Sequence, residues 1–386
     1  MYEALSYFSQ KYEPIHGYIS AVICPMGTLM NLANIIVLTR AGMRNPINLM
    51  LTAVALCDTI VMASNLVFVI HFILVAAKRC VHTDFTYGWA MFALVHAHIS
   101  LVGHSNSVWL SVTMALVRYV TIRRAETGVQ RPLSSNNTIT LCVCVLCVVI
   151  LVACPVFLSY GVVAIIPEYT MSTCMRYATN FTLDKQTVRR RVMEAGTYMP
   201  VSVSAMRHDC TMLRLAFWTT GIAFKMLPCL LLTVFIGLLL RMLATVKNRR
   251  RRLGAGQNRN NATVHQVKTS TCGSPADRTT RMLITLLAVF LITEIPQGAL
   301  ALASGIFDVE FRRKIYNPLG NLLDLLSLIN SSLNFVILCT MSKRFRQTFL
   351  NVFLPRRVYQ KVSTGQGLDM ELTHAISRFR RTSLKS

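Results

Sequence analysis

The sequence predicts an all-α protein, a bundle of seven transmembrane helices followed by a short amphipathic helix in the membrane interface. The chain has 386 residues, of which 53% are hydrophobic and only 15% are charged. A soluble domain usually carries about 25% charged residues, so a cytosolic enzyme and a disordered chain are both excluded. The net charge of +24 belongs to basic residues between apolar stretches, which does not fit a water-facing DNA-binding domain.

Seven apolar stretches have the length of membrane-spanning helices, for which about 20 residues are needed. β-Barrel strands would be about 10 residues long and would alternate polar with apolar positions. Residues 230–236, read as LLLTVFI, do not alternate. The predicted spans are 17–39, 46–77, 88–122, 138–163, 213–243, 280–306 and 318–340.

The basic residues decide the orientation, because Lys and Arg accumulate in cytoplasmic loops. With the C-terminus inside, the inner segments hold 23 of the 40 Lys and Arg residues: two at 40–45, three at 123–137, eight at 244–279 and ten at 343–386. We therefore expect a multi-pass plasma-membrane protein with its N-terminus outside and its C-terminus in the cytoplasm. No signal peptide precedes Gly17, so the first span is expected to act as the insertion signal.

The segments outside the spans differ in character. Phe345, Phe349 and Phe353 recur every four residues among basic residues, the pattern of a helix in the interface plane with its aromatic rings in lipid. The polar inner loop lacks a hydrophobic period and is expected to be mobile. The predicted segments are an extracellular N-terminus at 1–16, the spans within 17–340, a long outer loop at about 164–212, a basic inner loop at about 247–279, the interfacial helix at 342–354 and a disordered cytoplasmic tail at 355–386.

The outer loops offer sites of covalent modification. Asn180 begins an Asn-Phe-Thr sequon in the long outer loop, where glycosylation is expected. Cys80, Cys174 and Cys210 lie in outer loops and can oxidise, but three is an odd number. The histidines and cysteines show no zinc-ligand spacing, so no metal ligands are predicted among them.

Ionisable residues within the spans are informative, because each costs roughly 2.5 to 3.5 kcal/mol at mid-bilayer. Asp58 lies in span two, Lys225 in span five, Glu294 in span six and Asp324 in span seven. Glu294 is either neutral or paired with Lys225, and it either contacts a ligand directly or is structural. The uncharged polar residues that accompany these four are Asn34, Asn106, Ser107, Asn330, Ser331 and Asn334.

Several motifs in order along the spans are similar to those of rhodopsin-like G-protein-coupled receptors. They comprise Asn34-x-x-Val37 in span one, the run from Asn48 to Asp58 in span two, Arg118-Tyr119 at the end of span three, Pro228 in span five, and Phe290 with Pro296 in span six. The runs 104–112, 277–283, 293–298 and 330–335 narrow the resemblance. They resemble the invertebrate branch that contains myosuppressin receptors, sex-peptide receptors and nematode receptors for FMRFamide-like peptides.

The resemblance implies a cell-surface receptor for an amidated FMRFamide-like or myosuppressin-like neuropeptide. Such a receptor activates a heterotrimeric G protein, of the Gi/o type in this branch, and its tail meets arrestin and a receptor kinase. The alternatives are an orphan or chemosensory seven-helix receptor with a non-peptide ligand, or a transporter. The sequence shows neither the inverted repeat nor the paired Gly/Pro interruptions of a transporter, and no grouped nucleophile and base of an enzyme.

Departures from the family pattern carry expectations of their own. Val117 replaces the acidic residue before Arg118, which removes a restraint on that arginine and is expected to raise basal activity. Phe335 and Leu338 replace the proline and tyrosine of the span-seven motif, and Glu294 replaces a tryptophan. Ala93 occupies the place of the usual span-three cysteine, so Cys174 is expected to pair with Cys80 or with Cys210.

The resemblance also assigns roles to residues. Arg118 and Tyr119 would couple to the G protein, and Phe290 and Pro296 would form the activation hinge, since a proline removes a helical hydrogen bond. The inner polar network would hold a sodium ion or waters between oxygen ligands; its members are Asn34, Asp58, Ser107, Asn330 and Asn334. A purely water-mediated network is the alternative.

Ligand contacts are expected near the outer side of the bundle. Asp324 is expected to face the outer cavity and to pair with the guanidinium of an Arg-Phe-amide peptide, because carboxylate and guanidinium form strong charge-assisted hydrogen bonds. His104 is either a cavity residue or a hydrogen-bonded core residue. The other residues expected to line the cavity are Glu294, Gln297, Lys225 and Ser100.

Overall fold

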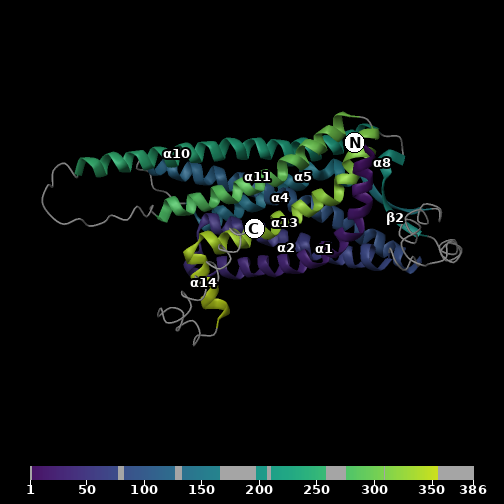
Figure 1. The fold of residues 1–386 in the computed structure, drawn as a ribbon, viewed down its shortest axis with the longest axis horizontal. Helices are drawn as coiled ribbons and strands as arrows, with labels where there is room; N and C mark the ends of the chain where they lie inside the picture. The colour runs from purple at the N-terminus through teal and green to yellow at the C-terminus, as the bar shows by residue number, and fades with distance from the viewer. Residues whose placement is uncertain are drawn as a thin grey trace, which may run out of the picture.

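The computed structural model describes residues 2–76, 82–126, 133–165, 197–206, 210–257, 275–307 and 309–354. They form a long helical bundle with a two-stranded hairpin at one end (Figure 1). We call the end near the N-terminus the outer end and the opposite end the inner end. The principal helices are α1 Tyr2–Leu38, α2 Pro46–Phe68, α4 Tyr87–Glu126, α5 Ser135–Ser159, α10 Leu227–Gln257, α11 Pro275–Ile306, α13 Asn317–Met341 and α14 Lys343–Phe353. The shorter elements are η1 Ala41–Met43, η2 Val69–Ala76, η3 His82–Phe85, β1 Tyr160–Ile165, β2 Thr197–Ser202, α8 Val203–Met206, α9 Cys210–Trp218, η4 Thr219–Met226, α12 Val309–Phe311 and η5 Arg312–Tyr316.

Six helical stretches of the described chain are long and apolar enough to cross a membrane. They are Ile15–Leu38, Pro46–Ala76, Ser135–Ser159, Thr211–Thr245, Thr280–Ser304 and Lys314–Met341. The seventh predicted span lies in α4, which is more polar and contacts α2, α5, α10 and α11. A helix enclosed by its neighbours needs less apolar surface than one that faces lipid. The predicted bundle of seven helices is confirmed, and the chain is a multi-pass membrane protein.

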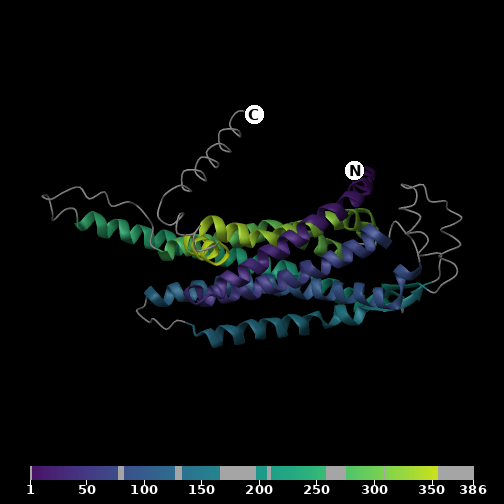
Figure 2. The ribbon, with the colours of Figure 1, turned by 90° about the horizontal axis from the view of Figure 1, so that it is seen from below.

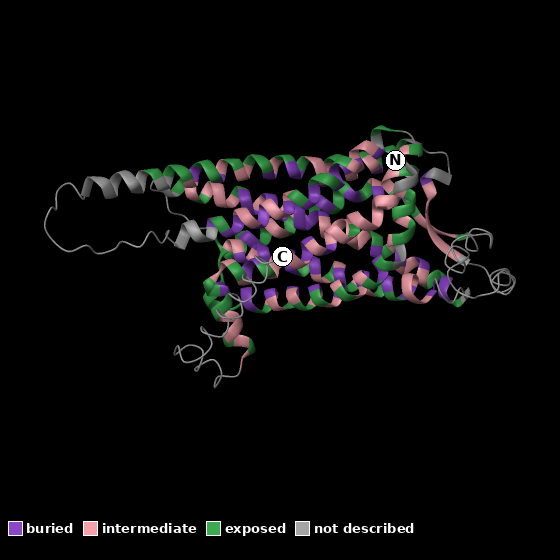
Figure 3. Ribbon diagram, viewed as in Figure 1, coloured by how far each residue is buried: buried purple, intermediate pink, exposed green. Residues whose placement is uncertain are grey.

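The lipid-facing surface of the bundle is apolar. Large side chains such as Leu151, Leu230 and Ile292 are 69%, 61% and 71% exposed, and exposed residues follow the outward faces of the helices (Figure 3). In water, such an apolar surface would promote aggregation, whereas the hydrocarbon of a bilayer solvates it. Fully buried residues such as Leu110 and Leu232 fill the centre of the bundle.

Within the described residues, three segments have π-helical hydrogen bonding and lie at the outer ends of spans: η2, η4 and η5. π-Helical turns are rare and frequently mark functional positions. The segment η4 joins α9 directly to α10 and carries Lys225. It packs against α11, so it brings a charged residue of span five next to span six.

Two segments predicted to lie outside the spans are partly helical. Helix α10 continues to Gln257 and α11 begins at Pro275, so the described ends of the inner loop predicted at 247–279 are helical. The basic residues of this stretch are good helix formers, and α10 projects beyond the inner end of the bundle (Figures 1 and 2). At the other terminus, α1 begins at Tyr2, so the segment predicted as an N-terminal extension is helical as far as it is described.

The all-α prediction missed one hairpin. Strands β1 and β2 pair antiparallel, with Tyr160 opposite Ser202 and Ile165 opposite Thr197. Valine and tyrosine favour extended chain, and Tyr198 packs edge-on against Tyr87 of α4, with ring centroids 5.6 Å apart. The hairpin therefore occupies the described ends of the predicted outer loop at the outer end of the bundle.

The short helix α14 turns away from the bundle axis (Figure 1). Ser342 caps it, since its Oγ accepts a hydrogen bond of 3.2 Å from the Phe345 backbone N–H. Phe345 is completely buried, and Phe345 and Phe349 both pack against Phe335, with centroids 6.0 and 5.6 Å away. The prediction that the aromatic residues face lipid is wrong for Phe345. The predicted tail at 355–386 lies outside the described residues.

Candidate functional site

A cavity of about 390 Å³ opens among the outer halves of the helices, a volume within the range of small-ligand pockets, about 300 to 1,000 Å³. Five residues predicted for ligand binding line it: Ser100, His104, Lys225, Gln297 and Asp324. Glu294, the sixth, is completely buried behind the lining. Sequence reasoning missed several other polar lining residues, including Asn65, His96, Tyr316 and Ser327.

Asp324 lies toward the outer part of this cavity, with its side chain 48% exposed. Its Oδ2 is 3.2 Å from Nε2 of His16, a buried residue of α1. His16 also lies within hydrogen-bond reach of the Tyr12 hydroxyl, at 3.5 Å, and of Ser20 Oγ, at 3.3 Å. Burial and the negative charge of Asp324 both raise the pKa of Tyr12. The sequence offers no signal for His16, because it lies just before the first predicted span.

Three ionisable side chains from three helices meet behind the cavity. Lys225 Nζ donates a hydrogen bond of 2.7 Å to Glu294 Oε2, and His104 Nε2 is 2.9 Å from Glu294 Oε1. We call Glu294, Lys225 and His104 the buried triad. An unpaired carboxylate could not be buried at this depth, because its desolvation would cost several kcal/mol. The structure thus pairs Glu294 with Lys225, one of the two arrangements left open by the sequence.

Gln297 extends the buried triad one turn further along α11. Its Oε1 accepts hydrogen bonds from Lys225 Nζ at 3.0 Å and from Ser327 Oγ at 3.2 Å. Its Nε2 donates to the Thr293 carbonyl at 3.3 Å. Gln297 therefore ties span six to spans five and seven across the floor of the cavity.

Glycine allows span five to approach span six closely. A Cβ added to Gly298 would lie 3.2 Å from Lys225 Cβ and 3.3 Å from Met226 Sδ. These distances are tighter than most side-chain contacts allow. The small residue on α11 therefore lets Lys225 reach Glu294 and Gln297.

A second polar cluster surrounds Asp58 deeper in the bundle. Asp58 Oδ1 accepts hydrogen bonds from Ser107 at 3.1 Å and Ser331 at 3.4 Å, and Oδ2 accepts one from Asn334 at 3.2 Å. Ser107 and Asn334 therefore contact Asp58 as the sequence suggested, and Ser331 joins them. The cluster connects spans two, three and seven.

Two predicted members of this cluster lie elsewhere. Asn34 donates to Asn31 at 3.4 Å, and Asn31 donates to the Ser331 carbonyl at 3.1 Å. Asn330 is buried, but among the described contacts it makes no hydrogen bond to Asp58. Asn31 lies one turn from Asn34 on the same face of α1, so Asn34 is linked to span seven through Asn31.

The residues around Asp58 fit a small hard cation. They supply carboxylate and hydroxyl oxygens, which are among the ligands such a cation prefers. The Oδ1 atom of Asn34 is buried without a hydrogen-bond partner in the described structure. A buried acceptor of this kind suits a water or an ion.

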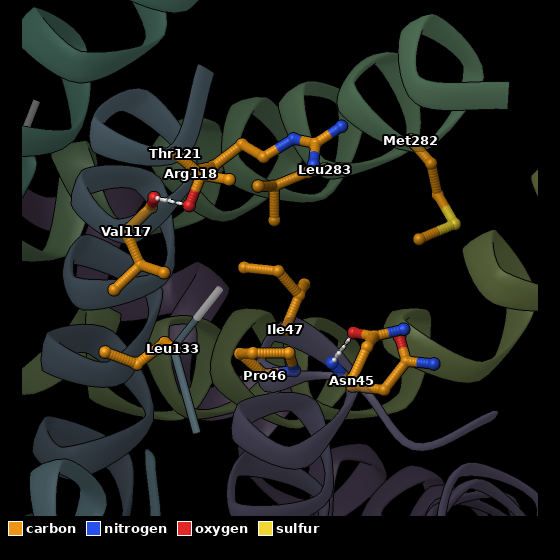
Figure 4. A pocket seen from close by; sticks show the side chains of 10 residues that line it. Asn45, Pro46, Ile47, Val117, Arg118, Thr121, Leu133, Met282 and Leu283 are labelled. Atoms are coloured by element: carbon orange, nitrogen blue, oxygen red, sulfur yellow. Dashed lines mark hydrogen bonds between the residues drawn. The ribbon is translucent and has the colours of Figure 1, made fainter. Parts of the chain in front are cut away.

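At the inner end, Arg118 joins α4 to α11. Its Nε and Nη2 donate to Thr280 Oγ1 at 3.0 and 2.6 Å. Arg118 borders a cavity of about 300 Å³ with the start of α2 and the inner end of α11, including Asn45, Met282 and Leu283 (Figure 4). The carbonyl of Val117 accepts a hydrogen bond of 2.7 Å from the Thr121 hydroxyl (Figure 4).

The remaining predicted residues are placed as follows. Tyr119 packs under the Arg123 guanidinium, 6.0 Å from the ring centroid. Phe290 is buried and stacks on His104 at 6.4 Å, and Pro296 lies inside the unbroken helix α11. Cys80, Cys174 and Asn180 lie outside the described residues. Cys210 begins α9, but its side chain is not among those described.

Comparison with known proteins agrees with this architecture. Residues 18–355 match the family described as "Serpentine type 7TM GPCR chemoreceptor Srw". The chain is 41% identical over 370 residues to "G-protein coupled receptor dmsr-1" of Caenorhabditis elegans, covering 90% of this chain and 69% of the relative.

More distant relatives come from Drosophila melanogaster. The "Sex peptide receptor" is 23% identical over 356 residues, covering 91% of this chain and 75% of the relative. The "FMRFamide receptor" is 23% identical over 347 residues, covering 89% and 54%. The family match spans nearly the whole described bundle, and the chain therefore belongs to the Srw family of serpentine seven-transmembrane G-protein-coupled receptors, which are receptors and not enzymes.

Proposed function

We propose that the chain is a plasma-membrane receptor for an amidated neuropeptide that ends in Arg-Phe-amide, of the FMRFamide-like or myosuppressin-like kind. The observation that carries the proposal is the half-exposed carboxylate of Asp324 in the outer cavity. The relatives named for FMRFamide and sex peptide support a peptide as ligand. In the proposed orientation, which places the outer cavity on the extracellular side, the N-terminus lies outside the cell and the C-terminus inside.

The charges around the cavity favour a cation next to Asp324. Lys225 also lines the cavity, but its charge is compensated by Glu294 at 2.7 Å. Asp324 has His16 as its ion-pair partner, which is charged only if protonated. A guanidinium would form a charge-assisted, two-pronged contact with this carboxylate, which matches an arginine next to the peptide's C-terminal residue.

The bonds across the bundle suggest how binding is transmitted. Gln297 and Glu294 hold the middle of α11 to α4, η4 and α13, and Thr280 holds its inner end to Arg118. A ligand that binds preferentially when α11 has moved outward shifts the population toward that arrangement. Arg118 and Tyr119 then become available to a heterotrimeric G protein of the Gi/o type, and arrestin and a receptor kinase act at the tail.

G-protein dissociation in cells that express the receptor tests this proposal. Peptides ending in Arg-Phe-amide should activate it at submicromolar concentration, and alanine in place of the peptide's arginine should weaken activation by at least about tenfold. Silence toward the whole amidated panel, despite surface expression, would contradict the proposal. Pertussis toxin, which blocks Gi/o coupling, should abolish the response.

A non-peptide ligand is the second candidate, because the matched family is described as chemoreceptors. A cavity of about 390 Å³ would hold a small organic cation as readily as the end of a peptide. Activation by small amines with no response to the peptide panel would favour this candidate.

A further inference from the structure

The floor of the outer cavity contains a cation whose charge is already neutralised. Lys225 Nζ has three N–H donors, and the described residues account for two of them, through Glu294 at 2.7 Å and Gln297 at 3.0 Å. Lys225 lines the cavity, with its side chain 13% exposed. The third N–H of Lys225 is therefore left for a ligand that enters the cavity.

Glu294 compensates the positive charge of Lys225 across 2.7 Å. His104 Nε2 lies 2.9 Å from Glu294 Oε1, and its imidazole is charged only if protonated. When His104 is neutral, Lys225 and Glu294 cancel, and Gln297 adds only an amide dipole. A neutral acceptor such as a carboxamide oxygen can bind here without further cost, whereas a carboxylate would find no net positive charge to offset its desolvation.

We infer that the buried triad selects peptides with a C-terminal amide over those with a free C-terminal carboxylate. This inference rests on the proposed function and adds the residues that read the peptide's end. Asp324 lies one turn from Ser327 on α13, and Ser327 bonds Gln297 beside Lys225. The anionic end of the cavity and its neutral floor thus lie close enough for one dipeptide, with the guanidinium at Asp324 and the terminal amide at Lys225.

Charge compensation, more than shape, then sets the selectivity. Removing the charge of Glu294 leaves Lys225 as an uncompensated cation, which attracts a carboxylate. The geometry also provides a rescue, because Gln297 Oε1 lies 3.0 Å from the same Nζ. A carboxylate at position 297 can replace the one lost at 294.

The test compares FMRFamide, its free acid and a panel of matched Arg-Phe-amide and Arg-Phe-acid pairs on cells with equal surface receptor. In the wild type, the amide should be more potent by about tenfold or more. Glu294→Gln should reduce the amide-to-acid potency ratio by about tenfold, and the double variant Glu294→Gln/Gln297→Glu should restore it. Rescue would not follow if Glu294 were only structural.

Other outcomes overturn the inference. Equal loss of potency for amide and acid in Glu294→Gln, with no rescue by the double variant, would assign the triad a structural role only. If Glu294→Gln does not reach the cell surface, Gln297→Glu alone decides, since added negative charge should raise the amide-to-acid ratio and an unchanged ratio contradicts the inference. Silence of the wild type toward every amide would overturn the proposed function and this inference with it.

Discussion

Nε2 of His16 lies 3.2 Å from Oδ2 of Asp324, and this pair joins the outer part of α1 to span seven. His16 is 4% exposed, whereas Asp324 is 48% exposed and faces the cavity. A ligand cation that binds Asp324 must therefore share or replace the His16 contact. Under the proposed function, α1 would therefore take part in ligand binding through His16.

Asp324→Asn should reduce the potency of Arg-Phe-amide peptides by about tenfold or more, because a charge-assisted hydrogen bond contributes about 1.5 to 3 kcal/mol. Dose-response curves of G-protein dissociation measure the effect at matched surface expression. Glu310→Gln is the control, since this exposed carboxylate pairs with Lys314 at 3.0 Å outside the cavity lining. Equal effects of both variants would contradict the assignment of Asp324.

His16→Ala should raise the potency of the same peptides about two- to tenfold, because a competing hydrogen bond of roughly 0.5 to 1.5 kcal/mol is removed from Asp324. The dose-response assay also measures this change. In the Asp324→Asn background the substitution should have no effect on potency. A loss of potency in the single variant would mean that His16 itself contacts the peptide.

Thr280→Ala should raise ligand-independent G-protein signalling, because Arg118 loses a partner that holds α4 to α11 at 2.6 and 3.0 Å. We expect basal signalling to rise about two- to tenfold over the wild type. One hydrogen bond of a charged group is lost, and water that hydrates Arg118 offsets part of its free energy. Thr285→Ala serves as the matched control, since its hydroxyl bonds the Arg281 carbonyl of its own helix. Unchanged basal signalling in Thr280→Ala would show that the contact does not restrain α11.

Sodium should stabilise the receptor through Asp58. Replacing NaCl by choline chloride should lower the Tm of the purified wild-type receptor. A cation that binds the folded state but not the unfolded state raises the free energy of unfolding, and choline removes this contribution. Asp58→Asn should abolish this dependence on sodium, because it removes the carboxylate charge of the cluster. The same sodium dependence in wild type and Asp58→Asn would contradict an ion at this position.

Phe345→Ala should destabilise the receptor by about 3 to 5 kcal/mol, the usual cost of deleting a fully buried phenylalanine. Phe353→Ala should have a much smaller effect, because Phe353 is 47% exposed. Thermal unfolding of the purified receptor in detergent compares the two. Similar shifts in Tm would contradict the packing of α14 on Phe335.

Some features of the site were predictable because they depend on residue type within a span. Asp58, Lys225, Glu294 and Asp324 are conspicuous because charge is rare in an apolar helix. Their partners were less accessible. Asn31 was missed, and Ser331 was noted as a polar residue of span seven but not assigned to Asp58. A shift of three or one residues along a helix changes which side chain meets a neighbour.

The structure of the loops could not be predicted from the pattern of apolar residues either. The hairpin of β1 and β2 joins segments more than 30 residues apart, and its pairing depends on contacts with α4. The inner extension of α10 to Gln257 lacks an apolar face, so hydropathy could not distinguish it from coil. Helix propensity was the available signal.

The sequence by itself determined the number of spans, their orientation preference and the family, because these depend on the length of apolar runs, the distribution of basic residues and motifs local to one helix. The tertiary structure decided which polar residues meet: His16 with Asp324, Lys225 with Glu294 and Gln297, and Arg118 with Thr280. Helical periodicity shows which face of a helix is polar. The rotation and depth of that face relative to other spans follow only from the packing of all the helices together.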